Sequence, residues 1–546
     1  VRDKKFTALA VATSMIFGIA TPLTTVKATE NLAPENLEKK GEEASLEKEG
    51  DVTIQILGTS DLHGRFMNYE YARNQKSDGG LNQISTLVNE ARNENPNTIV
   101  VDNGDTIQGN FNHLFKNGPN PMVMGMNAIG YDVFSLGNHE FNYGMDNLNN
   151  VVSQANDNLD VLCANLYKDG KRVYEGYTTR EIEGVEVALI GVVSPHIMKW
   201  DSENLKGYEA KNPAEEVGFV IDEIENRPEG GADVYAVVSH VGLESEYGNG
   251  DSARAIAEMN PEVSAIVAGH SHTNVPEEKI NNAVISQPTS NGQMVSKIEL
   301  TVRKNGEKVE VVDKKSKLLS TKGVAEDQKI NDLLTDFHNT AIADATAPVG
   351  EMVGGNLADK NEIKEIPQSL VEDQGITDFI NEVQLYNSRK HLESKNINPD
   401  EVYMVSGAAL FSASSNLYEG NISKADISNI YRYDNKLYTI KTNGKQLKKY
   451  MEKNAEYYNT YKDGDLTVSF NEDVRMYLYD MFDGVSYEIN ISKEPGQRIE
   501  NLKFEKDGKP VEDSDVVYLT VNDYRYNSGL AAGIMDQGEH EKIYDT

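Results

Sequence analysis

The chain has 546 residues, a formal net charge of −34 and a single cysteine. This length exceeds what one hydrophobic core accommodates, so we expect about two to four domains. The negative charge repels phosphate backbones and excludes a long nucleic acid as a partner. A small anionic substrate stays compatible with it if bound metal ions offset the field locally. Cys163 has no partner for an internal disulfide, and we expect a small buried hydrophobic residue rather than a nucleophile.

The N-terminal segment 1–28 has the build of a secretory signal peptide. Basic residues at positions 2, 4 and 5 precede an apolar stretch, and small residues surround a cleavage point after Ala28. A membrane anchor is the alternative, because the apolar stretch is nearly long enough to span a bilayer. We favour cleavage, which leaves no stable membrane span and places the protein in the medium, on the cell surface or in the cell wall. Residues 29–50 are charged and poor in apolar residues, which predicts a flexible spacer.

From Asp51 onward, apolar strands that end in polar loops alternate with helical segments. Strands are expected within 51–64, 97–106, 131–141, 187–196, 233–242 and 263–273, and helices within 79–95 and 213–227. This alternation predicts a layered α/β fold over 51–323. In such folds ligands gather at the carboxyl ends of the strands.

A helix expected over 324–346 leads into a second region, 347–546. This region is richer in tyrosine and in strand-and-turn patterns, which are typical of a separate domain. The chain ends on "EHEKIYDT" without a closing element, so we expect that further residues follow in the complete protein.

Polar residues that can bind metals cluster just after the predicted strands. Aspartate, asparagine, histidine and glutamate side chains of this kind are Asp61, His63, Asp102, Asn103, Asp105, Asn138, His139, Glu140, His240, His270 and His272. Two pairs, Asp61 with His63 and His270 with His272, are spaced two apart, so in extended backbone each pair points to one side. Carboxylate, imidazole and amide groups suit a first-row divalent metal such as Mn, Fe, Co or Zn. The set exceeds the needs of one ion, which favours two ions sharing a carboxylate, an arrangement that hydrolyses phosphate esters.

Five motifs in this set, in chain order, resemble those of the calcineurin-like metallophosphoesterases. They are "DLHG" (61–64), "GDTIQG" (104–109), "GNHEF" (137–141), "SHVG" (239–242) and "GHSHT" (269–273). The second region is similar to the C-terminal domain of the 5′-nucleotidase family, so that the resemblance covers about 50–546. It implies a four-layer β-sandwich flanked by helices, joined by a helix to a second, α+β domain.

The resemblance also implies a role for each residue. One metal ion would be bound by Asp61, His63 and His272, the other by Asn138, His240 and His270, and Asp105 would bridge them. His139 would stabilise the transition state or protonate the leaving oxygen, while a metal-activated hydroxide attacks phosphorus without a covalent enzyme intermediate.

Two branches of the family compete for the substrate. One hydrolyses 5′-nucleotides, and the other opens 2′,3′-cyclic nucleotides and then removes the 3′-phosphate. The second is favoured by "FMNYEY" (66–71), by "PHIMKWDSENLKGY" (195–208) and by Asn142, where 5′-nucleotidases carry an aspartate. A 5′-nucleotidase or a phosphoesterase of broad specificity is the alternative. An inactive surface-binding protein is the alternative of another class, and the complete ligand set argues against it.

The second region is expected to bind the nucleobase. Tyr433 and Tyr524 fall where the family has aromatic residues that stack on the base, although Tyr526 is a rival and core packing is the alternative. The stretch 405–416 lacks the arginine of the Gly-Gly-x-x-Arg loop in 5′-nucleotidases, which argues against 5′-nucleotide recognition. We expect small nucleotides as the only partners, two divalent ions as cofactors, and a monomer.

Overall fold

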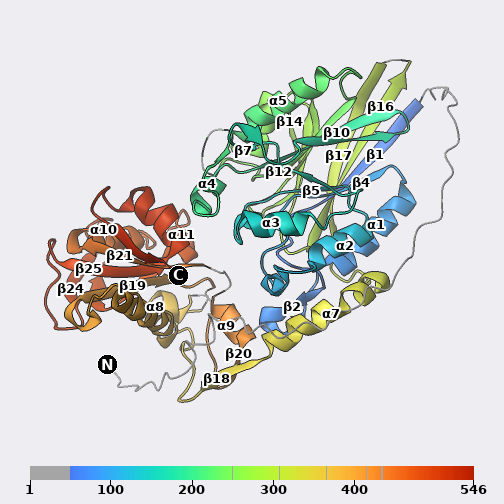
Figure 1. Cartoon of the computed structure of the whole chain (residues 1–546). Coiled ribbons are helices and arrows are strands. Elements are labelled where there is room, and N and C mark those ends of the chain that lie inside the picture. The colour runs from blue at the N-terminus through green and yellow to red at the C-terminus, as the bar shows by residue number, and fades with distance from the viewer. Residues whose placement is uncertain are drawn as a thin grey trace.

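The computed structural model describes residues 50–546, apart from 247, 249, 307, 365, 413, 414, 432–434 and 546 (Figure 1). The predicted signal peptide (1–28), nearly all of the predicted spacer and Tyr433 lie outside the described residues. Figure 1 shows two domains, with the N-terminal one in blue to yellow-green and the C-terminal one in brown to red.

The first domain is built on two six-stranded sheets. The first sheet has the order β17 (Lys308–Ser320), β16 (Met294–Asn305), β1 (Gly50–Thr59), β4 (Thr98–Asp102), β5 (Val133–Ser135) and β6 (Asp160–Leu162). The second has the order β14 (Asn274–Ile280), β15 (Ala283–Pro288), β13 (Val263–Ala268), β12 (Val234–His240), β10 (Val185–Val193) and β9 (Tyr177–Ile182). In the first sheet β1, β4, β5 and β6 pair in parallel, and β16 and β17 are added antiparallel at one margin. In the second sheet the four central strands pair in parallel, and β9 and β14 are antiparallel at the two margins.

Alternating apolar side chains hold the two sheets face to face. In β1, Ile54 and Ile56 enter the core between the sheets, whereas Leu57 faces the helices on the outer side. In β10, Leu189 enters the same central core, and its neighbour Ile190 faces the opposite outer layer. Because side chains of a strand alternate between its faces, each buried strand contributes to two cores at once.

Helices cover both outer faces of the sandwich. Buried residues of α1 (Leu81–Glu94), α2 (Pro121–Ile129), α3 (Met145–Val152) and α7 (Gln328–Ala345) share one core beside the first sheet. Those of α5 (Pro213–Glu225) and α6 (Ala253–Met259) share another beside the second sheet. The order helix, sheet, sheet, helix confirms the predicted four-layer fold. Cys163 is fully buried in the first of these cores, and burial raises the pKa of its thiol to about 12.

The helix α7 lies along the first domain and ends where the second begins. The second domain holds a five-stranded sheet flanked by α8 (Gly375–Ser394) and α10 (Gly444–Ala455). Its strand order is β22 (Asp480–Asp483), β19 (Tyr403–Ala409), β25 (Val516–Asn522), β21 (Leu437–Asn443) and β26 (Glu541–Asp545). Before this sheet, β18 (Pro348–Met352) pairs with β20 (Gly420–Ser423). Mixed strands with separate helices agree with the expected α+β domain.

Contacts between the domains lie on both sides of the chain connection. Asn429, in α9 (Lys424–Ile430), donates from Nδ2 to the carbonyl oxygen of Ala72 at 2.5 Å. Lys542 lies 3.4 Å from a carboxylate oxygen of Glu203. The short helix α4 (Ile197–Trp200) contacts the segment Tyr526–Ile534 of the second domain. Among the described residues, no helix is both long and apolar enough to cross a membrane.

The central core of the sandwich generates a prediction about stability. Leu189→Ala should lower the free energy of unfolding of the first domain by about 2–5 kcal/mol, because it leaves a cavity between the sheets. Urea unfolding followed by the fluorescence of Trp200, the only tryptophan, reports on this domain. The matched control is Leu333→Ala on α7, where the leucine is 38% exposed and the expected change is within about 0.5 kcal/mol. Equal losses for both variants would contradict the assignment of Leu189 to the core.

Candidate active site

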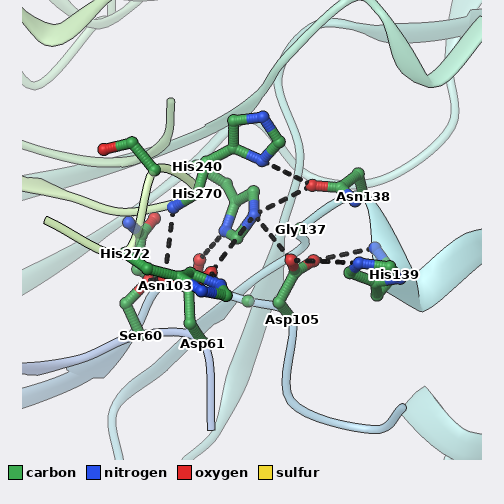
Figure 2. Close-up of polar contacts among 12 residues, drawn as sticks. Ser60, Asp61, Asn103, Asp105, Gly137, Asn138, His139, His240, His270 and His272 are labelled. Carbon is green, nitrogen blue, oxygen red and sulfur yellow. Dashed lines mark hydrogen bonds and ion pairs between the residues drawn. The ribbon is translucent and has the colours of Figure 1, made fainter. Parts of the chain in front are cut away.

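The predicted polar residues meet at one edge of the sandwich. The loops after β1, β4 and β5 of the first sheet and after β13 of the second converge there, and His240 is the last residue of β12. Figure 2 shows these side chains pointing toward one another from segments far apart in the sequence. They form two neighbouring groups, each of which could hold a metal ion: Asp61, His63 and His272, and Asp105, His240 and His270.

The first group combines one buried carboxylate with two imidazoles. Asp61 Oδ1 lies 3.2 Å from His272 Nε2, and His272 Nε2 lies 3.2 Å from His63 Nε2. The other oxygen of Asp61 accepts from the Ser60 hydroxyl at 2.5 Å and from the His270 backbone N–H at 3.1 Å. Hydrogen bonds therefore fix one carboxylate oxygen and leave the other facing the imidazoles.

The second group is assembled around Asp105. His240 Nε2 lies 3.1 Å from Asp105 Oδ2 and 3.2 Å from Asn138 Oδ1. His270 Nδ1 lies 2.8 Å from the same oxygen of Asn138. His240 donates from Nδ1 to the carbonyl oxygen of Asn103 at 2.5 Å, which turns its Nε2 toward the centre. The amide oxygen of Asn138 thus belongs to this group, although it carries no charge.

The backbone of the ligand residues corrects one expectation from the sequence. The pairs Asp61 with His63 and His270 with His272 do not lie in extended backbone. Left-handed φ angles of 54°, 45°, 53°, 66° and 56° occur at Asp61, His63, Asp105, His270 and His272, respectively. Such angles are uncommon outside glycine and concentrate at functional sites. Tight loops, rather than strand alternation, turn each pair toward the centre.

Glu140 holds two of these loops together, a role that sequence reasoning missed. This fully buried carboxylate accepts backbone N–H groups from Gly137, Asp105 and Thr106, each at 2.7 Å. The two loops touch so closely that a Cβ atom on Gly104 would lie 2.1 Å from the Gly137 nitrogen. Glu140 lies in the "GNHEF" motif, but nothing in the sequence indicates that it also binds the backbone of Asp105, 35 residues upstream.

The electrostatics of the cluster call for positive charge. Burial opposes the charged form of His240, yet the neighbouring carboxylates of Asp105 and Asp61 raise its pKa to about 10. Burial lowers the pKa values of His63 and His270 to about 4, so both imidazoles are neutral at pH 7, as metal ligands must be. Burial acts to raise the pKa of Asp105, but His240 and His139 hold it well below its usual range. The carboxylates therefore stay ionised in a buried site.

These residues fit a pair of divalent cations. Buried carboxylates with neutral imidazoles and an amide oxygen are donors that Mn, Fe, Co and Zn accept. Among the described residues, Asp61 Oδ1 is a buried oxygen without a hydrogen-bond donor, which a cation would satisfy. His63 Nε2 and His272 Nε2 lie 3.2 Å apart, and the ligand atoms within each group lie within 4.8 Å of one another, close enough to share one ion.

His139 lies beside the second group and is one-quarter exposed. Its backbone N–H donates to Asp105 Oδ1 at 2.7 Å, and its Nε2 lies 4.0 Å from Asp105 Oδ2. Its Nδ1 lies 2.6 Å from Asn142 Oδ1. The ring therefore lies beside the second group, between Asp105 and Asn142.

Two further residues lie near the cluster, Trp200 and Asp201. The ring of Trp200 stacks on His270, with centroids 5.2 Å apart and an angle of 29° between the ring planes. Asp201 accepts a hydrogen bond from Asn142 Nδ2 at 3.1 Å. Both belong to the "WDSENL" stretch, where only the resemblance drew attention to them.

The tyrosines of the second domain are placed only in part. Tyr524 lies in α11 (Asp523–Arg525), is half-buried, and stays outside the apolar core of its domain. Its rival Tyr526 packs against that core, with its ring centroid 5.6 Å from that of Tyr438. The segment that follows Tyr524 contacts α4, which carries Trp200.

Comparison with known proteins agrees with this geometry. Residues 54–274 match the calcineurin-like phosphoesterase family, and residues 349–533 match the 5′-nucleotidase C-terminal domain. The trifunctional nucleotide phosphoesterase protein YfkN of Bacillus subtilis is 27% identical over 579 residues, covering 94% of this chain and 37% of that protein. The chain therefore spans little more than a third of that relative.

A second relative is matched over most of its length. The 2′,3′-cyclic-nucleotide 2′-phosphodiesterase/3′-nucleotidase of Salmonella typhimurium is 26% identical over 552 residues, covering 89% of this chain and 83% of that protein. A crystal structure from Staphylococcus aureus, of a protein assigned as a 5′-nucleotidase, shares the fold. It has a TM-score of 0.73 and 24% identity, and covers 90% of this chain and 94% of that one. The chain therefore combines a calcineurin-like phosphoesterase domain, matched over 54–274, with a 5′-nucleotidase C-terminal domain, matched over 349–533.

Proposed function

We propose that this protein is an exported, dinuclear-metal phosphoesterase that hydrolyses 2′,3′-cyclic nucleotides to 3′-nucleotides and then to nucleosides. The observation that carries the proposal is the pair of neighbouring residue groups that could each hold a metal ion, the second of which contains Asp105. The substrate class is supported by the names of the relatives from Salmonella typhimurium and Haemophilus influenzae and by the presence of Asn142 beside His139. Export is supported by the composition of residues 1–28.

The ligand residues would divide between two sites. Asp61, His63 and His272 would hold one ion, and Asn138, His240 and His270 the other, with Asp105 shared between them. Two divalent ions supply Lewis acidity and lower the pKa of water, the chemistry that phosphoester hydrolysis needs near neutral pH. Mixed oxygen and nitrogen donors indicate first-row divalent ions, the class that includes Mn, Fe, Co and Zn.

His139 would serve the leaving oxygen in both reactions. In the first, water adds to phosphorus and the bond to O2′ breaks, which leaves a 3′-phosphate and a free 2′-hydroxyl. In the second, another water adds and the bond to O3′ breaks, which releases inorganic phosphate and the nucleoside. Each leaving oxygen needs a proton, and His139 Nε2 is the ring nitrogen on the side of Asp105.

The substrate is tested by following three nucleotides separately. Purified protein with Mn²⁺ is incubated with 2′,3′-cyclic AMP, 3′-AMP or 5′-AMP, and the products are resolved by chromatography. We expect the cyclic nucleotide to pass through 3′-AMP to adenosine, with 5′-AMP hydrolysed slowly. Rapid hydrolysis of 5′-AMP alone would replace the proposed substrate, and no hydrolysis of any phosphoester would favour a binding protein.

The shared carboxylate is the most direct test of the metal site. Asp105→Ala should abolish hydrolysis, because in the proposed arrangement this one carboxylate serves both ions. It should also weaken the binding of Mn²⁺ to protein treated with a chelator, measured as quenching of Trp200, whose ring stacks on His270. The control His338→Gln changes a histidine that contacts Tyr71 outside the cluster, and it should titrate as the unaltered protein does. An Asp105→Ala variant with full activity and metal content would contradict the two-ion assignment.

The tyrosines test how the base is bound. Tyr433→Ala and Tyr524→Ala should each weaken nucleotide binding by about 1–3 kcal/mol if the ring stacks on the base. The measurement is KM for the preferred nucleotide. Tyr526→Ala is the control, because that ring packs on Tyr438, and its loss should lower stability rather than raise KM. Unchanged KM values for the first two variants would reject the stacking role.

A further inference from the structure

A chain of hydrogen bonds connects His139 to a buried carboxylate in another loop. Asn142 Oδ1 lies 2.6 Å from His139 Nδ1, and Asn142 Nδ2 donates to Asp201 Oδ2 at 3.1 Å. Asp201 is separated from Asn142 by 59 positions in the sequence and is 8% exposed. An aspartate at position 142 would contact His139 directly. Here Asn142 contacts His139, and the carboxylate of Asp201 contacts Asn142.

Only one assignment of donors and acceptors fits the hydrogen bonds between His139, Asn142 and Asp201. Burial raises the pKa of Asp201 to about 6, so it is ionised at pH 7 and can only accept hydrogen bonds. Asn142 must then turn its NH₂ group toward Asp201 and its oxygen toward His139. Facing that oxygen, His139 Nδ1 must carry a proton and donate it. The side of the ring directed at Asp105, Nε2, is left as the nitrogen that exchanges protons.

Asp201 is itself held in place from two directions. It directly follows α4, where its backbone N–H donates to the carbonyl oxygen of Ile197, and its Oδ1 accepts from Asn204 Nδ2 at 3.1 Å. The same NH₂ group of Asn204 lies 3.0 Å from the carbonyl oxygen of Phe141 and 3.1 Å from that of Asn142. The loop that carries Asp201 is therefore tied to the loop that carries His139.

We infer that Asp201 is a positioning residue for the hydrolytic reaction, which fixes the orientation of the Asn142 amide and, through it, the tautomer of His139. The inference rests on the proposed function, because it assigns a partner to the residue that would protonate the leaving oxygen. The side chain of Asp201 is hydrogen-bonded to Asn142 and Asn204, so it acts on His139 through another side chain.

The first test replaces the carboxylate with an amide of the same size. In Asp201→Asn the new side chain offers an NH₂ group as well as an oxygen, so Asn142 can turn over and present its own NH₂ to His139 Nδ1. We expect kcat to fall about 10- to 100-fold, the usual cost of losing an outer hydrogen-bond partner, with KM within about twofold. The control is Asp132→Asn, a largely buried aspartate that accepts from the Val100 N–H away from the cluster, which should leave kcat unchanged.

A second substitution separates positioning from structural support. In the double variant Asn142→Asp with Asp201→Asn, the new carboxylate at 142 can only accept, so it again fixes the proton on His139 Nδ1, and the new amide at position 201 donates to it. Every hydrogen bond of the chain is then satisfied, with the amide and the carboxylate exchanged. We expect kcat to recover most of the loss. A double variant as slow as Asp201→Asn alone would overturn the inference, because a structural role would not be rescued in this way.

A nitrogen NMR measurement makes the inference independent of turnover. Protein labelled with ¹⁵N-histidine should show His139 protonated at Nδ1, assigned by comparison with His139→Gln, and a mixture of tautomers in Asp201→Asn. If the unaltered protein hydrolyses no phosphoester, the proposed function fails, and the tautomer still decides the role of Asp201. If the protein is active but Asp201→Asn keeps both its kcat and its tautomer, the inference alone fails.

Discussion

The site depends on one buried carboxylate, Glu140, that lies outside both candidate metal-binding groups. Glu140 accepts backbone N–H groups from the loop after β4 and from the loop after β5, and so fixes Asp105 and Asn138 relative to each other. Without these acceptors, several buried N–H groups would be left unsatisfied, at a cost of about 1–3 kcal/mol each. The second sheet then brings His240, His270 and His272 to this preformed edge. The cluster is therefore rigid because its framework is made of backbone hydrogen bonds rather than of the ligands themselves.

Burial of charge explains why different carboxylates face the imidazoles and hold the loops together. Asp61, Asp105 and Glu140 are all fully or nearly fully buried, and a buried carboxylate is stable only when it is paired or hydrogen-bonded. Glu140 is compensated by N–H groups and needs no cation. Asp61 and Asp105 face imidazoles, so their charge remains available to a divalent ion. This division lets an acidic chain with a net charge of −34 offer a cationic centre to an anionic substrate once ions are bound.

Much of the fold and of the candidate site could be predicted from the sequence. Strand periodicity predicted the strands, and the rule that ligands gather at carboxyl ends placed Asp61, Asp105 and His240 together. Periodicity could not predict the left-handed backbone at these positions, which loop closure imposes. Nor could it predict the contact between Asn142 and Asp201, because hydrogen bonds between distant loops leave no periodic signal. The stacking role of Tyr524 stays a prediction, since no nucleotide marks where the base lies.

The left-handed φ angles of the candidate ligand residues also limit which metal sites this scaffold can evolve. Aspartate, asparagine and histidine are the non-glycine residues that adopt this region most readily, and they are also common metal ligands. The same three residue types therefore satisfy both the backbone conformation and the donor chemistry. Aspartate and histidine occupy the five left-handed positions, Asp61, His63, Asp105, His270 and His272. Cysteine or glutamate at these positions would add backbone strain to any gain in affinity. Substitution of these residues by cysteine is therefore disfavoured by the backbone of the loops, whatever metal the site prefers.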